Sequence, residues 1–236
     1  MEQGYRFEVF TGRKGSTELP WLSQGRPTDD LPRVPVLPET LLKMELELHE
    51  ISTSLCGFSE AVLSDMGATI QILRLVGEEY GAATDRPIRI EDCISDLGPR
   101  ACVQAVASDT LLKGDRQQAV PVVWAHSREA AQYFKLFAAQ ASTRISPDQA
   151  YVAGLLHALG ALPSMLGWAR HGIEGSPARI AVELAESWHL PHFLKDFFLE
   201  VEMSGQSPEW SNFIAVAHHP AKESWLACPL SPLGAR

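Results

Sequence analysis

Apolar residues recur along most of the chain at the three- and four-residue spacing of an amphipathic helix. Between residues 68 and 80, for example, Ile70, Leu73 and Val76 repeat every third residue, and Gly81 is well placed to end the helix. Comparable patterns predict helices over residues 39–49, 59–63, 90–97, 101–112, 120–141, 146–157, 176–189, 191–202 and 210–218. The alternation typical of strands is nearly absent after residue 32, so we predict an all-α fold.

Some of these helices carry sharper predictions about individual residues. Ser59 and Ser146 are N-cap candidates, and Pro147 stands at the first helical position, where proline is tolerated. In the segment 39–49 the leucines form one broad apolar stripe, which is expected to face the core while the glutamates stay outside it. The stripe consists of Leu41, Leu42, Leu46 and Leu48.

Composition divides the chain into three parts. Residues 1–32 are rich in proline and glycine and are predicted to form an extended arm, in which residues 5–9 alternate as in a short edge strand. A polar link at residues 113–118 then separates two helical halves, which we place at residues 33–115 and 116–236.

Charge and cysteine usage exclude some classes of partner and compartment. The chain has 20 Lys and Arg against 29 Asp and Glu, a formal net charge of -9, and contains no local basic stripe. Such a chain repels phosphate backbones, so we expect no nucleic-acid partner. The four cysteines are scattered, as is typical of free thiols in a reducing compartment, and the first residues lack a signal-peptide pattern. We therefore expect a cytoplasmic protein.

Residues 150–169 contain no charged side chain and are about as long as a membrane span requires. However, the segment includes Gly154, Gly160 and Pro163, and neither end carries a cluster of basic residues. We predict a buried core helix that breaks near Pro163, and no membrane contact.

Six segments stand out when the chain is followed in order. In the first half they are LPRVPVLPETLLKM, LSDMGATIQILRLVGEEYG and IRIEDCISDLGPRACVQAV. In the second half they are VVWAHSREAAQYFKLFAA, DQAYVAGLLHALGALP and VELAESWHLPHFL. In this order they resemble the HDOD family (HD-related output domain), over about residues 31–218. The resemblance implies an N-terminal helical subdomain packed on an HD-like helical bundle. It also implies a bacterial cytoplasmic signalling protein of a kind that usually lacks demonstrated catalysis.

The resemblance also locates the positions of an HD metal site. HD-type phosphohydrolases bind a divalent metal through a His on one helix, a His-Asp pair on the next and a later Asp. Here these positions hold His126, then His157 followed by Ala158, and no aspartate follows Asp196; a further histidine position matches Pro177. Two imidazoles without a carboxylate make a poor hydrolytic centre. We therefore predict no catalytic, metal-binding or cofactor-binding residues. The relict histidines are expected to form a core pair or to bind a transition metal weakly.

Three functions compete at this stage. The first is a non-catalytic scaffold that binds a signalling protein. The second is a small-ligand sensor that holds a nucleotide or cyclic dinucleotide in the relict HD cavity, with Arg74, Arg128 or Arg170 on its phosphate. The third is an active phosphohydrolase whose metal centre recruits residues such as Glu183 or Glu223.

Overall fold

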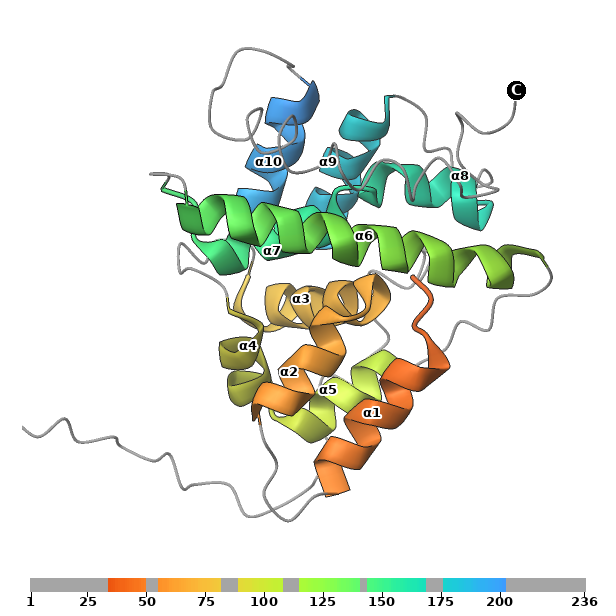
Figure 1. Ribbon diagram of the computed structural model, residues 1–236, viewed down its shortest axis with the longest axis vertical. Coiled ribbons are helices and arrows are strands. Elements are labelled where there is room, and N and C mark those ends of the chain that lie inside the picture. Colours follow the sequence, from red (N-terminus) through yellow and green to blue (C-terminus); the bar gives the residue numbers. More distant parts are fainter. Residues whose placement is uncertain are drawn as a thin grey trace, which may run out of the picture. The chain divides into compact units, whose positions relative to one another are not determined.

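The computed structural model describes residues 34–49, 55–81, 89–107, 115–140, 144–168 and 176–202, except for the side chains of 115–119 and 202. These residues form helices and contain no strand, which confirms the all-α prediction (Figure 1). The helices are α1 (Pro38–His49), α2 (Leu55–Leu63), α3 (Met66–Tyr80), α4 (Ile90–Leu97), α5 (Pro99–Ala107), α6 (Asp115–Gln140), α7 (Pro147–Leu156), the 3-10 helix η2 (Leu159–Ala161), α8 (Leu162–Leu166), α9 (Pro177–Ser187) and α10 (His192–Glu202). The predicted arm with its strand, and the predicted helix 210–218, lie outside the described residues.

α3 is the central helix of a first group that comprises α1 to α5. It contacts α2, α4 and α5, and every residue from Met66 to Gly77 except Gln71 is buried. The side chain of Asp65 caps its first turn by accepting a hydrogen bond of 3.0 Å from the Ala68 amide. Gly81 ends it with a φ of 80°, in the region that favours glycine, which confirms the predicted helix end.

The second group is built on α6 and α7, which pack along one another. Gly154 makes the close approach possible, because a Cβ there would lie 2.7 Å from the Cα of Ala131 on α6. α7 begins with a capping box in which Ser146 and Gln149 each bond the other's backbone amide, at 3.2 and 3.1 Å, so the predicted N-cap is confirmed. α9 packs on α10 and η2.

Two hydrogen bonds tie the groups together along a seam between α1–α5 and α6–α10. Trp124 Nε1 on α6 donates to Asp65 Oδ1 over 2.9 Å, and the Tyr151 hydroxyl on α7 donates to the Leu63 carbonyl over 3.0 Å. This confirms that an N-terminal helical subdomain packs on a second helical bundle. The boundary proposed at residues 115–116 stays a prediction.

The turn between α9 and α10 also packs on the seam. The guanidinium of Arg74 in α3 lies over the ring of Trp188, 5.2 Å from its centroid. The next residue, His189, has a φ of 53° and places its carbonyl against Gly77 of α3, where a Cβ would have no room. The Trp-x-Leu-Pro segment thus serves to dock the second group on α3.

The prediction that Ser59 begins a helix is wrong. α2 begins at Leu55, and Ser59 lies inside it, where its hydroxyl donates to the Cys56 carbonyl over 2.9 Å. Serine satisfies its hydroxyl on the preceding turn of a helix as readily as it caps one.

α7 ends at Leu156, within one residue of the helix end predicted at 157, so the apolar segment 150–169 breaks before Pro163 rather than near it. There His157 Nδ1 lies 2.6 Å from the Gly154 carbonyl and takes an acceptor that the helix would otherwise use. Pro163 instead lies near the start of α8, where proline is tolerated. Among the described helices none is both long and apolar enough to cross a membrane.

The leucine stripe of α1 faces the core only in part, since Leu41 and Leu48 are half-buried. Leu42 and Leu46 are 57% and 58% exposed, whereas Thr40 and Met44 are buried. Asp65 explains the rotation, because its carboxylate accepts hydrogen bonds from the Leu37 amide and from the Thr40 side chain and so turns that face of α1 inward.

Candidate functional site

The structure brings His126 and His157 together. His126 lies in the middle of α6 and is 1% exposed, and His157 follows the last residue of α7. Their Nε2 atoms are 3.1 Å apart, and the ring centroids are 5.0 Å apart at an interplanar angle of 62°. Two residues separated by 31 positions therefore share one hydrogen bond between the paired helices.

The direction of that bond follows from its second partner. The Gly154 carbonyl can only accept, so the proton of neutral His157 lies on Nδ1, and its Nε2 is left as an acceptor. His126 must then donate from Nε2. The result is a chain in which His126 donates to His157 and His157 donates to the backbone of α7.

The ligands expected of an HD metal centre are not assembled around this pair. Ala158, at the position that matches the Asp of the signature, offers only a methyl group. Within the described ranges no group of three or more His, Cys, Asp or Glu side chains is placed to hold a metal ion. At the position that matches a further histidine, the Pro177 carbonyl packs against Gly160 without space for a Cβ. These residues do not fit an HD-type centre, since the two imidazoles lack a carboxylate.

The other candidates for the site fall in different places. Arg74 is buried under Trp188 at the seam. Glu183 is on the outer surface of α9, where it accepts a hydrogen bond of 3.2 Å from Arg179. Arg170 and Glu223 lie outside the described residues. Of the two described arginines considered for phosphate, Arg128 lines both of the cavities described below, and Arg74 lines neither.

A cavity of about 530 Å³ opens along the seam, between α2 and α4 on one side and α6 and α7 on the other. Sequence reasoning missed it, because its walls come from four helices and most of its side chains are polar. Its lining residues are Cys56, Ser59, Glu60, Leu63, Ser64, Arg89, Ile90, Glu91, Arg128, Gln132, Lys135, Asp148, Tyr151 and Val152. Neither His126 nor His157 is among them.

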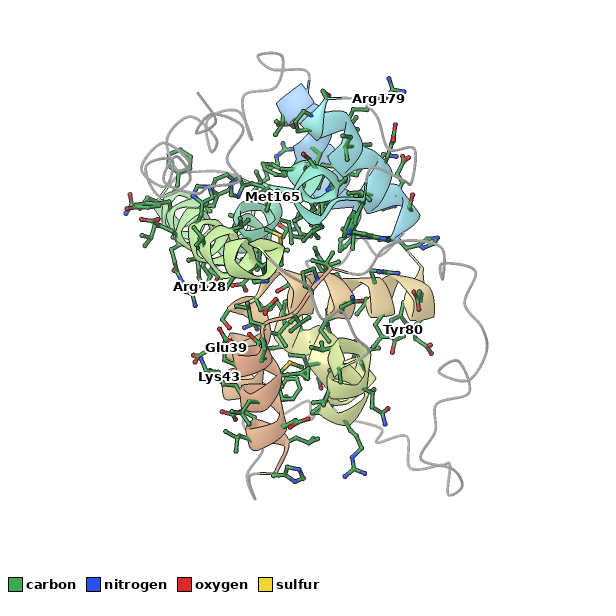
Figure 2. The ribbon with its side chains drawn as sticks, turned by 90° about the vertical axis from the view of Figure 1, so that its right-hand side faces the viewer. Glu39, Lys43, Tyr80, Arg128, Met165 and Arg179 are labelled. Atoms are coloured by element: carbon green, nitrogen blue, oxygen red, sulfur yellow. The ribbon has the colours of Figure 1, made fainter. Side chains whose placement is uncertain are left out.

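A second cavity, of about 180 Å³, adjoins the first one, and both are lined by Ser64 and Arg128. It extends the opening towards α1, which contributes Glu39 and Lys43. Figure 2 shows these two side chains on α1 and Arg128 on α6 along the same side of the protein. We call the two joined cavities the seam furrow.

Four of the eight described charged side chains that line the seam furrow form ion pairs with one another. Arg89 bonds Glu91 at 2.9 Å and Asp148 at 3.3 Å, and Lys135 lies 3.6 Å from Asp148. Arg128 is different, since it is exposed and has no ion-pair partner among the described residues. Burial raises the pKa of Tyr151, and the positive charge of Arg128 lowers it. Both side chains line the larger cavity.

Trp124 lines the smaller cavity, and its indole donates a hydrogen bond to the buried Asp65. Burial raises the pKa of the Asp65 carboxyl group, and hydrogen bonds from Leu37, Ala68, Thr40 and Trp124 act in the opposite direction. The sequence signal was present, because an aspartate immediately before a helical pattern is an N-cap candidate. The hydrogen bonds of Asp65 to Thr40 on α1 and Trp124 on α6 could not be predicted from neighbouring residues in the sequence.

Comparisons with known proteins agree with this architecture. The HDOD domain model matches residues 34–171, which is more than half of the chain. The structure of the MmoQ response regulator from Methylococcus capsulatus str. Bath has a TM-score of 0.65 at 21% identity, covering 86% of this chain and 90% of that one. A virulence factor from Campylobacter jejuni subsp. jejuni has a TM-score of 0.57 at 18% identity, covering 80% and 76%. A search of curated proteins finds no match.

Proposed function

Because the chain belongs to the HDOD domain family, we propose that it is a non-catalytic signalling protein that acts by binding another protein. MmoQ, whose fold it shares, is named a response regulator, which supports a place in signal transduction. The proposal includes the bacterial cytoplasmic setting that the sequence leads us to expect. It includes neither nucleic acid nor a membrane as a partner, in keeping with the net charge of -9.

The observation that carries the proposal is the direct hydrogen bond between His126 and His157, together with Ala158 at the position of the signature aspartate. A hydrolytic metal centre needs carboxylates to neutralise the cation and to orient its water. Here the two imidazoles bond each other through Nε2, and His157 also bonds the Gly154 carbonyl. The relict positions therefore contribute to the packing of α6 on α7 rather than to a reaction.

The test combines metal content with activity, on protein purified without chelator or histidine tag. Elemental mass spectrometry is expected to find well below one divalent metal per chain. Hydrolysis of bis(p-nitrophenyl) phosphate with added Mn²⁺, Co²⁺ or Mg²⁺ is expected to stay at the background rate. A stoichiometric metal together with hydrolysis that is lost in His126→Ala would overturn the proposal and favour the phosphohydrolase.

A small-ligand sensor is the second candidate, and the larger cavity favours it. About 530 Å³ lies within the range of small-molecule sites, which is roughly 300–1,000 Å³. The walls offer Arg89, Arg128 and Lys135 to a phosphate, although Arg89 and Lys135 are already paired with carboxylates. We place this candidate in the seam furrow rather than beside the histidines. Thermal stabilisation by a nucleotide or cyclic dinucleotide, lost in Arg128→Ala, is the result it requires.

A further inference from the structure

Among the described residues, the seam furrow has polar side chains without partners, and the helices that form it carry exposed apolar side chains. On its α6 wall, Arg128 and Gln132 lie one helical turn apart and are both exposed. The side-chain amide of Gln132 makes no hydrogen bond with the described residues, so it can donate to and accept from a peptide bond. The Gln132 amide lies next to the Arg128 guanidinium, which has no ion-pair partner among the described residues. Together these two groups are suited to bind a polypeptide that carries a carboxylate side chain.

Exposed leucines lie on helices that form both walls of the furrow. On α1, Leu42, Lys43 and Leu46 lie three, four and seven positions after Glu39, which places them on the same broad face of the helix. Both leucines are more than half exposed. On α6, Leu136 follows Gln132 by one turn and is 55% exposed. Exposed apolar side chains beside a polar furrow are typical of a protein-binding surface, whereas a small anion would make no use of them.

The balance of charge also bears on the occupant. Glu91 and Asp148 are paired with Arg89 and Lys135, so on the described part of the α6 wall the cation left for an incoming group is Arg128. Lys43 adds a second positive side chain at the α1 end. Glu39 and Glu60 line the same furrow, so a densely anionic ligand such as a polyphosphate would be repelled by them. A chain segment with an isolated acidic residue avoids this repulsion.

We propose that the seam furrow is a docking surface for a segment of a partner protein, with an Asp or Glu side chain of that segment bound by Arg128 and apolar side chains on Leu42, Leu46 and Leu136. The inference rests on the proposed function, since it names the surface through which the scaffold binds. The bound segment crosses the seam and contacts both groups of helices.

The experiment selects binders from a phage-displayed random peptide library on the full chain and measures their affinity for two charge-reversal variants. The variants are Arg128→Glu and the control Arg179→Glu, which alters the net charge equally but lies on α9 away from the furrow (Figure 2). Enriched peptides are expected to contain Asp or Glu. Arg128→Glu is expected to weaken them by at least about tenfold, and Arg179→Glu to leave them unchanged. Circular dichroism confirms that both variants fold.

Two further measurements locate the bound peptide. Cys56 is exposed and lines the furrow, so bound peptide is expected to slow its reaction with N-ethylmaleimide, as followed by mass spectrometry of its own tryptic peptide. Leu42→Ser is expected to weaken binding without any change of charge. Peptides that tolerate Arg128→Glu, an unprotected Cys56, or a library without enriched binders would each overturn the proposal. So would pyrophosphate or a nucleotide that binds at Arg128 where no peptide does.

These outcomes are separable from failure of the proposed function. If a partner captured from a native lysate binds wild type and Arg128→Glu equally, the scaffold function stands and the docking surface is wrong. If the chain hydrolyses phosphodiesters with a bound metal, the proposed function fails whatever the peptides show.

Discussion

Trp124 Nε1 donates a hydrogen bond of 2.9 Å to Asp65 Oδ1, and this bond joins the two groups of helices through a buried carboxylate. The same carboxylate accepts from the Leu37 amide at 2.8 Å and from the Ala68 amide at 3.0 Å. One side chain therefore fixes the chain entering α1, the first turn of α3 and the position of α6.

Asp65→Ala is expected to destabilise the fold by about 3 kcal/mol or more, because it leaves several buried donors without an acceptor. Urea denaturation followed by tryptophan fluorescence measures the change. Asp96→Ala is the control, since Asp96 is exposed in the last turn of α4, where a carboxylate gains nothing from the helix dipole. Equal stability of the two variants would contradict the role assigned to Asp65.

The stability contributed by Asp65 is expected to fall as the pH rises. Burial raises the pKa of this carboxyl group above its unfolded value, so between the two pKa values the folded state binds more protons than the unfolded state. The contribution is complete below the unfolded pKa and is lost as the pH passes through the folded one. We expect the stability of wild type relative to Asp65→Asn to decline in urea titrations from acidic pH upward. A difference that instead grows with pH would mean that the hydrogen bonds outweigh burial.

Gly77→Ala is expected to cost about 1–3 kcal/mol, because the new Cβ meets the backbone carbonyl of His189. Gly57→Ala is the matched control in another helix, where the Cβ would meet only the flexible carboxylate of Glu47, 2.5 Å away. Alanine also has a higher helix propensity than glycine, and this stabilises the variant by up to about 1 kcal/mol and offsets that contact. Thermal unfolding distinguishes the two, and equal effects would argue against docking of the Trp-x-Leu-Pro turn on Gly77.

Ala158→Asp is expected to raise the affinity for Mn²⁺ by about tenfold, or ~1.4 kcal/mol. It supplies a carboxylate next to His157, at the position where the HD signature has one. Isothermal titration calorimetry compares the variant with wild type, and the double variant with His157→Ala serves as control. If wild type already binds Mn²⁺ as tightly, the ligand set has been misjudged.

Glu60→Gln is expected to speed the labelling of Cys56 by N-ethylmaleimide at neutral pH. The carboxylate of Glu60 raises the pKa of the Cys56 thiol, and its loss increases the fraction of reactive thiolate. Cys93 and Cys102 are internal controls, because burial raises their pKa values to about 12 and keeps them unreactive until the chain unfolds. An unchanged rate at Cys56 would show that Glu60 does not act on the thiol in solution.

Local features of the fold were predictable from the sequence. The N-cap at Ser146 and the end of α3 at Gly81 depend on a few neighbouring residues, and both are found as predicted. The orientation of α1 was not predictable, because the hydrogen bonds that the Asp65 carboxylate accepts from Leu37 and Thr40 override the leucine pattern. Ser59 was misread for a similar reason, since a serine suits both the start and the interior of a helix.

The candidate sites also differ in how far the sequence could predict them. The histidine pair could be proposed because a family resemblance relates positions that are 31 residues apart. The seam furrow could not, because its walls combine exposed polar residues of several helices that no periodic pattern connects. The importance of Arg128 becomes visible only when its neighbours Arg89 and Lys135 are seen to be paired.

The position of the furrow has a thermodynamic consequence. Its walls belong to different groups of helices, so the site exists only while the two groups are apposed. Occupancy and apposition are then linked equilibria, and an occupant that needs both walls favours the closed arrangement by its own free energy of binding. Through this linkage a bundle of helices can register the arrival of another molecule as a shift in its own conformational population, without making or breaking a covalent bond.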